Sequence, residues 1–310
     1  MVTTENLPPL VYEKWVDSRM TLHLIFQIIG KAKLKLTQRK NHWWYMTLQP
    51  SSRGFSTYHI PLDGGIDTLD IHIDIAERAV ILHSSQGVIK KIDLASSPTV
   101  AHFYASFLEA LAEFGLHPVF IKTPLDMPVT KPFSEITEYH HYHWDSIREF
   151  WKAMRWTMDV FQEFSGRFYG KTCPVHIYWH SLDLTVTRFS GKRLPSDEEK
   201  KGRLLERDTY SHEQISFGFW AGDPKTPQPM YYSYTFPAPE GLDQEPLSPE
   251  GATWIDANGS PMAMVSYQAV REAADPRSAL LAFLESAYQG GAKRAGWNIE
   301  ELTAPPLNEM

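Results

Sequence analysis

The chain has 310 residues, of which 43% are hydrophobic and 22% are charged. This balance supplies apolar material for about two domains and excludes a wholly disordered, collagen-like or coiled-coil chain. A formal net charge of −7 provides no broad basic surface for nucleic acid, and a single cysteine, Cys173, excludes an internal disulfide framework and a multi-cysteine zinc site.

Nothing in the sequence predicts a membrane segment or a secretory signal. The apolar stretch of residues 20–30 is interrupted by His23 and Gln27, and it is much shorter than the roughly 20 residues that span a bilayer. The N-terminus has no apolar run of the secretory type. By elimination, we expect a cytoplasmic protein.

Four helices are predicted where apolar residues recur at three- and four-residue steps. They cover residues 18–36, 97–115, 145–168 and 275–290. The last one starts at Asp275-Pro276, a typical helix cap followed by proline, and is expected to end before Gly290-Gly291.

Strands are predicted where apolar and polar residues alternate, or where β-branched and aromatic residues gather. In the first half they are residues 42–48 and 53–60, a hairpin around Pro50-Ser51-Ser52, followed by 68–75, 79–84 and 88–94. In the second half they are residues 118–122, the tight hairpin 175–179 and 183–189, and then 214–220, 230–236, 253–256 and 262–265.

The two halves share one order of elements: a helix, a hairpin, further strands and a helix that starts at proline. We therefore predict an α+β protein of two tandem helix–antiparallel-sheet–helix repeats, residues 1–116 and 117–310, with insertions at 192–210 and 221–250 in the second. With a strand at 118–122, the second half reads β-α-β4-α. This arrangement is similar to the TATA-binding-protein-like and helix-grip folds. In helix-grip proteins a ligand cavity often lies between sheet and helix.

Two strings look like catalytic motifs but lack the required spacing. Residues 166–172 have three residues between their glycines, whereas a phosphate-binding P-loop needs four. His212-Glu213 does not begin a zinc-protease motif, because position 216 holds Ser216 instead of histidine. We predict neither a metal site nor a cofactor, and we keep His212 and Glu213 as acid–base candidates.

Aromatic, histidine and arginine residues gather in the two hairpins, which is the strongest signal for a site. Aromatic walls with a few polar groups are typical of small-molecule pockets, and equally of a core filled by large rings. The candidate ligand-binding residues are His42, Trp44, Arg53, Tyr178, Trp179, Arg188 and Trp220.

Three functions stay open. The first is a protein that binds a small, partly apolar ligand between sheet and helix. The second is an enzyme whose catalytic candidates are His176, Asp183, His212 and Glu213, with an arginine to orient an anionic group. The third is a protein-interaction module whose working surface is the proline-rich segment 224–249. We expect no nucleic-acid or membrane partner, and the oligomeric state stays open.

Several strings carry a resemblance to a known family. They are Thr21-Leu22-His23-Leu24, Asn41-His42-Trp43-Trp44, Pro174-Val175-His176, residues 183–191 and Tyr210-Ser211-His212-Glu213. The chain resembles, nearly end to end, a bacterial family catalogued as domain-of-unknown-function family 5996. The resemblance implies a cytoplasmic bacterial protein, and it implies no activity, cofactor or catalytic residue.

Overall fold

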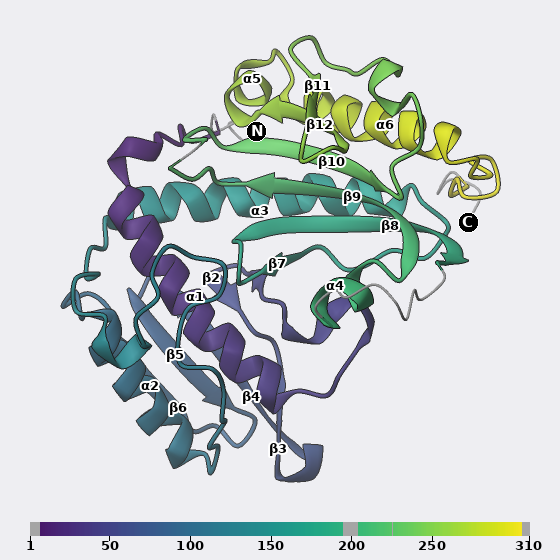
Figure 1. Cartoon of the computed structure of the whole chain (residues 1–310). Helices are drawn as coiled ribbons and strands as arrows, with labels where there is room; N and C mark the ends of the chain where they lie inside the picture. The colour runs from purple at the N-terminus through teal and green to yellow at the C-terminus, as the bar shows by residue number, and fades with distance from the viewer. Residues whose placement is uncertain (1–6, 195–203, 225, 306–310) are drawn as a thin grey trace.

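The protein has an α+β fold with two antiparallel sheets, each of six strands. The computed structural model describes residues 7–194, 204–224 and 226–305. Figure 1 shows the N-terminal sheet below the C-terminal sheet, with the first helix, α1 (Val16–Leu36), running from beside one sheet to the other.

The N-terminal sheet has the strand order β1-β2-β4-β5-β6, and β3 also pairs with β4. Its strands are β1 (Gln49–Pro50), β2 (Gly54–Ser56), β3 (Ile60–Leu62), β4 (Asp67–Asp74), β5 (Ala79–Ser84) and β6 (Ile89–Asp93). The strict alternation of β4 places Leu69, Ile71 and Ile73 in the core, where they are at most 1% exposed. The strands predicted at 68–75, 79–84 and 88–94 are thus confirmed.

Helix α2 (Val100–Glu113) follows this sheet and packs against α1 and β6. It begins two residues later than a cap at Ser97 would place it, because the Thr99 side chain accepts a hydrogen bond from the His102 N–H.

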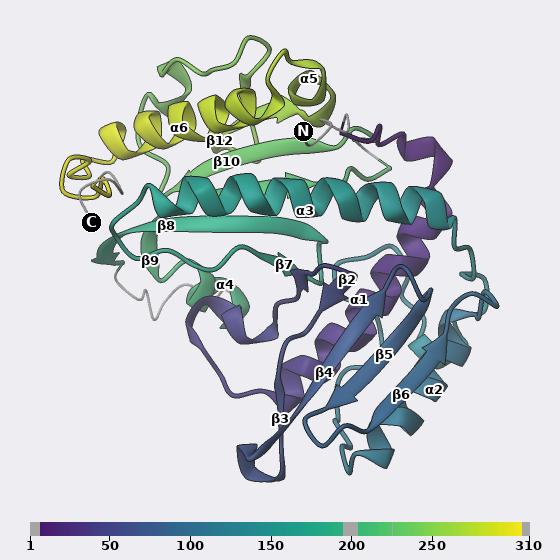
Figure 2. The same ribbon diagram turned by 180° about the vertical axis from the view of Figure 1, so that it is seen from behind.

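The C-terminal sheet has the strand order β11-β12-β10-β9-β8-β7. Its strands are β7 (His176–Tyr178), β8 (Asp183–Arg193), β9 (His212–Trp220), β10 (Met230–Phe236), β11 (Thr253–Asp256) and β12 (Pro261–Ser266). The helices around it are α3 (Trp144–Gly166), α4 (Leu204–Thr209), α5 (Tyr267–Glu272) and α6 (Pro276–Arg294). Figure 2 shows α3 in front of β8 and β9, and α3 and α6 pack against each other and against this sheet.

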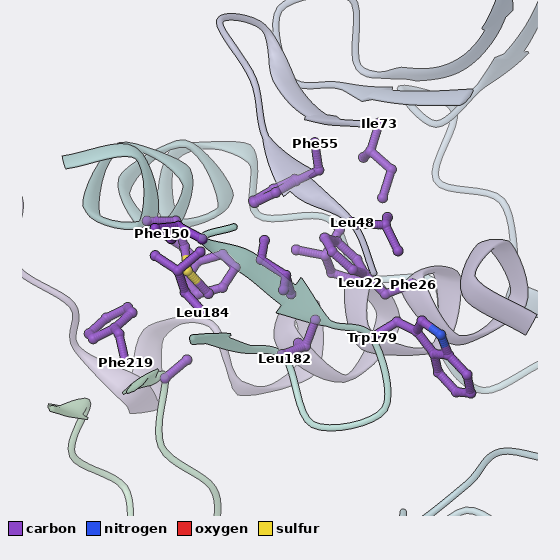
Figure 3. Packing of buried hydrophobic residues seen from close by; sticks show 14 of the residues in the cluster. Leu22, Phe26, Leu48, Phe55, Ile73, Phe150, Trp179, Leu182, Leu184 and Phe219 are labelled. Atoms are coloured by element: carbon purple, nitrogen blue, oxygen red, sulfur yellow. The ribbon is translucent and has the colours of Figure 1, made fainter. Parts of the chain in front are cut away.

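Five short 3-10 helices complete the described elements: η1 (Tyr12–Lys14), η2 (Asn41–Met46), η3 (Asp63–Gly65), η4 (Phe133–Glu135) and η5 (Leu242–Gln244). A single buried hydrophobic cluster includes side chains of both sheets and of the helices between them. In Figure 3, Leu22 and Phe26 of α1 lie near Leu48, while Phe150 of α3 lies near Leu184 of β8.

The two sheets meet at one pair of residues. The Leu48 N–H donates to the Ile177 carbonyl at 3.0 Å, and the Ile177 N–H donates back to Leu48 at 2.7 Å. Both residues are almost completely buried. The first hairpin of one half is therefore joined to the first hairpin of the other by an antiparallel bridge.

The strand predicted at residues 42–48 is wrong, because this segment forms η2. His42 and Trp43 adopt φ values of 55° and 63°, in the left-handed region that a strand does not use. The hairpin around residues 50–52 exists, but its strands are the shorter β1 and β2. The alternation of large rings in 41–45 misled the prediction, since these rings are held by tertiary contacts.

Two more predictions are wrong. Residues 118–122 form no strand, so the β-α-β4-α pattern does not hold, and the sheet of the second half has six strands. Helix α6 does not stop at Gly290-Gly291 but continues to Arg294. A Cβ at Gly291 would lie 2.3 Å from Oγ1 of Thr235 on β10, so glycine here allows the helix to approach the sheet closely.

The two segments predicted as insertions differ in character. Residues 195–203 of the charged segment lie outside the described residues, and α4 follows them. The segment 221–250 contains β10, which pairs with both β9 and β12. No helix in the described part of the chain is long and apolar enough to cross a membrane.

Candidate functional site

The C-terminal sheet turns a polar face away from α3 and α6, and we call this the open face because these two helices do not cover it. Several of its side chains, among them His176 and Thr185, are nevertheless buried by other segments. Because side chains alternate along a strand, Leu184 and Phe217 point into the core while their neighbours occupy the open face. In Figure 1 this face of β8, β9 and β10 is turned towards the viewer. Its residues include His176, Tyr178, Asp183, Thr185, Thr187, Phe189, Gln214, Ser216, Gly218, Trp220, Tyr232 and Tyr234.

Asp183 and Tyr232 form the central contact of the open face. The Tyr232 hydroxyl donates a 2.8 Å hydrogen bond to Oδ2 of Asp183. The strand between them makes this possible, because Gly218 has no side chain. A Cβ there would lie 2.2 Å from Cζ of Tyr232, so the tyrosine ring lies across the β9 backbone towards β8.

The Asp183 carboxyl has unusual electrostatics. Burial raises its pKa from 3.8 to about 7, and the Tyr232 hydrogen bond, the charge of Arg19 and a contact with the Ser181 hydroxyl offset only part of this effect. Its second oxygen, Oδ1, is buried and has no hydrogen-bond partner among the described residues. At neutral pH the carboxyl is divided between its protonated and charged forms, so it can both donate and accept a hydrogen bond.

Two further polar atoms without a described partner lie beside Asp183. His176 pairs with Thr185 across β7 and β8, and Tyr178 pairs with Asp183. The four side chains therefore share one corner of the open face. His176 Nε2 and Thr185 Oγ1 are buried and, like Asp183 Oδ1, have no partner in the described part of the chain.

His176 is a neutral group. Burial, with the nearby charge of Lys33, lowers its pKa from 6.5 to about 3. Lys33 itself is buried and donates to the carbonyls of Thr47 and Thr57, and burial lowers its pKa to about 8. The corner thus offers a neutral imidazole beside a carboxyl that changes its charge near pH 7.

Tyrosines make up the rest of this corner. Burial raises the pKa values of Tyr178, Tyr232 and Tyr234, so their hydroxyls are uncharged at any ordinary pH. The Tyr178 hydroxyl donates to the His42 carbonyl at 3.1 Å, and the Tyr232 and Tyr234 rings are stacked with 6.4 Å between centroids. Flat rings and neutral hydroxyls suit a partly apolar molecule.

Arg19 brings a positive charge from α1. It is 5% exposed, and its Nε has no partner among the described residues. Burial lowers the pKa of Arg19, while the charges of Tyr12, Asp223 and Asp183 oppose that effect. A guanidinium remains protonated under these conditions, so it contributes a buried cation near the carboxyl.

The other end of the open face holds a second cluster of predicted residues. His42 is 3% exposed, and its ring centroid lies 5.2 Å from that of Trp44 and 5.3 Å from that of His212. Phe189 of β8 lies 4.7 Å from His42. The structure therefore brings His42, Trp44 and His212 together, at the opposite end of β8 from Asp183.

The remaining predicted residues lie elsewhere. Glu213 accepts a 2.8 Å hydrogen bond from the Ser190 hydroxyl and, by alternation, lies on the other side of β9 from His212. Trp220 ends β9, at the opposite end of this strand from His212. Trp179 packs against α1 at Gly30, where a Cβ would lie 2.1 Å from its ring.

Both predicted arginines are also remote from the open face. Arg188 is 1% exposed and lies on the helix side of the sheet, with its guanidinium carbon 3.5 Å from the centroid of Phe164 and 4.3 Å from that of Tyr288. Arg53 belongs to the N-terminal sheet, where it pairs with Asp74 at 2.5 Å and lines a surface cavity of about 340 Å³.

The space in which we expected a ligand, between the C-terminal sheet and its helices, is occupied by core side chains. Phe164 of α3 meets Phe217 of β9 at 4.7 Å between centroids, and both are fully buried. Tyr231 of β10 forms a 3.1 Å hydrogen bond with Thr157 of α3.

Sequence reasoning missed Gly218 and Tyr232 of the open face, and Arg19 and Lys171 beside it. The alternation of residues 230–236 does place Tyr232 and Tyr234 on one face of a strand. Only the pairing of β9 with β10 shows that these tyrosines lie on the same face of the sheet as Asp183. Within the described ranges, no group of three or more His, Cys, Asp or Glu residues is arranged to hold a metal ion.

Fold and site together define an α+β protein with a tyrosine-rich, partly charged face on its second sheet. The model of a family described as "Family of unknown function (DUF5996)" matches residues 7–304. The chain belongs to that family, which confirms the resemblance seen in the sequence. No match to the chain was found among curated proteins or among solved structures.

Proposed function

We propose that the protein binds a small, partly apolar ligand at the Asp183 corner of the open face. The observation that carries this proposal is the group of three buried polar atoms without described partners, Asp183 Oδ1, Thr185 Oγ1 and His176 Nε2. Buried polar atoms are nearly always hydrogen-bonded, and leaving one unpaired costs about 1–3 kcal/mol. A bound molecule that pairs with them recovers this free energy.

The chemistry of the corner defines the ligand. Asp183 donates or accepts according to its protonation, the Thr185 hydroxyl does both, and the His176 imidazole is neutral. These groups fit an uncharged amide or hydroxyl rather than a strong acid or base. The rings of Tyr178 and Tyr232 fit an apolar or aromatic remainder of the same molecule.

Benzamide is a suitable first probe, because it joins an aromatic ring to an amide. Saturation-transfer NMR on the full chain should show benzamide binding and little binding of toluene, which has no polar group. Thr185→Val removes one hydroxyl and keeps the volume, and it should weaken benzamide binding at least fivefold. Thr37→Val, on the far end of α1, is the matched control and should not change it.

The proposal fails if wild-type protein gives no benzamide signal, or if the Thr185→Val and Thr37→Val variants bind benzamide equally well. Thermal melting of each variant verifies that it is folded. Native mass spectrometry of the purified chain adds a direct view, since a co-purifying molecule that disappears in Thr185→Val would identify the natural ligand class.

A second candidate function is acid–base catalysis with Asp183 as the acid or base. It is favoured by one observation, the pKa of about 7 at Asp183, because an efficient general acid or base has a pKa near the working pH. Of the other predicted catalytic residues, His176 shares the corner, whereas His212 and Glu213 do not. Turnover of an amide or ester probe that follows a single ionisation near pH 7 and is lost in Asp183→Asn would support it, and turnover unchanged in Asp183→Asn would exclude it.

We also propose that the two halves are tandem repeats of one unit, comparable in shape to TATA-binding-protein-like and helix-grip folds. In support, each half begins with a long helix, continues with an antiparallel sheet and ends with a second helix. Separate alignments of the two halves across related chains should match each other, and the absence of such a match would overturn the idea. We also propose that the protein is bacterial and cytoplasmic. Fractionation of the cells that produce it tests the cytoplasmic location.

A further inference from the structure

We propose that the Lys171 end of the open face is a binding site for a small oxyanion, a carboxylate or a phosphate group. The Lys171 ammonium and the His212 imidazole would hold the anion, and the buried ring of His42 positions the lysine. This site lies at the opposite end of β8 from Asp183, six residues or about 20 Å along the strand, and its existence does not depend on the function proposed above.

The hydrogen bonds of His42 fix its protonation. Nδ1 lies 3.3 Å from the Thr209 carbonyl, which can only accept, so Nδ1 carries the proton. Nε2 then has a free lone pair, and it lies 3.3 Å from Nζ of Lys171. Lys171 donates one of its three N–H groups to this nitrogen, which leaves the other two for a ligand.

Two aromatic rings hold the ammonium in place. Nζ of Lys171 lies 4.8 Å from the Phe189 centroid and 5.4 Å from the Trp44 centroid, within the range of cation–π contacts. The lysine is exposed at the surface, and no carboxylate of the described residues forms an ion pair with it. It is an oriented, accessible cation without a carboxylate counter-ion in the part of the chain that the structure describes.

The charges around it are mainly positive. Burial and the positive charges of Lys171 and Arg193 lower the pKa of His212, and burial and Lys171 lower that of His42. Asp208 is an acidic group whose charge acts on His42, and it pairs with Arg39 at 3.2 Å. Glu213 is turned to Ser190 and Lys192. An oxyanion placed here would offset the repulsion between Lys171 and the protonated form of His212.

The local backbone is shaped for this contact. His42 and Trp43 are two consecutive non-glycine residues in the left-handed region, with φ of 55° and 63°. Such conformations are strained and persist where surrounding contacts hold them. Here they direct the His42 ring towards Lys171 and the Trp44 ring alongside it, although His42 and Lys171 are 129 positions apart in the chain.

The test is an anion titration of the full chain, followed by the histidine ring signals in NMR. Sodium phosphate and sodium acetate are added in separate series at constant ionic strength, with chloride as the reference. We expect millimolar binding, with the His212 signals shifting and the His212 pKa rising because a bound anion favours its charged form. Tighter binding of phosphate would mark a phosphate site, and tighter binding of acetate a carboxylate site.

Lys171→Met keeps the apolar stem on the two rings and removes the charge, and it should weaken anion binding at least tenfold. Lys192→Met, a nearby exposed lysine paired with Glu213, is the matched control and should bind as wild type does. Asp183→Asn should also bind anions normally, which separates this site from the one at Asp183. The proposal is overturned if phosphate and acetate shift His212 no more than chloride does, or if folded Lys171→Met binds them as tightly as wild type.

Discussion

Tyr232 reaches across a whole strand to bond Asp183: its hydroxyl donates to Oδ2 at 2.8 Å over the bare backbone of Gly218. A side chain at position 218 and this hydrogen bond therefore exclude each other. The contact joins β10 to β8 without involving the backbone of β9. It holds the carboxyl in position and offsets part of the rise in its pKa that burial causes.

Gly218→Ala should displace the Tyr232 ring, because the new Cβ would lie 2.2 Å from its Cζ. We expect a loss of about 1–3 kcal/mol in the free energy of unfolding, measured by urea denaturation, as is usual for overpacked sites. Gly166→Ala is the control, since no atom lies within 4 Å of that Cβ, and it should be neutral or slightly stabilising. Equal effects of the two substitutions would contradict this account.

Asp183 should make stability depend on pH in a defined direction. Its pKa is about 7 in the folded protein and near 3.8 in the unfolded chain, so between these pH values the folded state binds one proton more. The contribution of Asp183 to the free energy of unfolding is therefore fully present below pH 4 and is lost as the pH rises to 7. The loss amounts to up to about 4 kcal/mol.

Asp183→Asn removes this ionisation while keeping an oxygen that accepts from Tyr232. The variant should gain stability relative to wild type as the pH rises from 4 to 8, and the gain should level off above pH 7. Urea unfolding curves at five pH values measure the difference. A difference that stays constant across this range would show that the carboxyl has an ordinary pKa in the folded protein.

Arg188 should be important for stability and not for binding. Its buried guanidinium lies against Phe164 and Tyr288 and donates to the Phe164 carbonyl. Arg188→Ala leaves a cavity and an unpaired carbonyl, and we expect it to cost about 3–5 kcal/mol in thermal or urea unfolding. Glu285→Gln, 4.0 Å from the arginine and partly exposed, should cost less than about 1 kcal/mol. A loss from Glu285→Gln as large as that from Arg188→Ala would show that the ion pair, and not the packing, is decisive.

Cys173 should be unreactive in the folded protein. The thiol is 2% exposed, its sulfur accepts a 3.1 Å hydrogen bond from the Thr187 N–H, and burial raises its pKa to about 11. At pH 8 we expect Ellman's reagent to label it at least about 100-fold more slowly than in urea-unfolded chain, because the thiolate is the reactive form. Rapid labelling of folded protein would indicate that the segment around Pro174 opens.

Much of the fold follows from local pattern. The alternation of β4, the aromatic and β-branched run of β10 and the Asp275-Pro276 start of α6 all predicted elements that the structure contains, because burial of one face requires that spacing. The failures share a cause. The aromatic residues of 42–48 are typical of a strand, and the Gly290-Gly291 pair is typical of a helix end. In the structure, contacts with residues distant in the sequence, Lys171 and Thr235, decide the conformation of these two segments.

The sequence predicted residues of the candidate site correctly only where they lie within one hairpin. His176, Tyr178 and Asp183 were candidates because β7 and β8 are adjacent in the chain and pair directly. Tyr232 and Lys171 were missed because their contacts depend on which strands become neighbours in the sheet. Arg53 and Arg188 were chosen because they are arginines in the two hairpins, and this does not say which face of the sheet a side chain occupies.

The bridge between Leu48 and Ile177 has a consequence for cutting the chain. Each of these residues occupies a sheet edge that would otherwise offer unpaired N–H and C=O groups, and such edges readily recruit further strands into aggregates. A fragment ending near residue 116, or one beginning at 117, would lose the partner that blocks its edge. We expect either fragment alone to be prone to aggregation, and the pair produced together to protect each other.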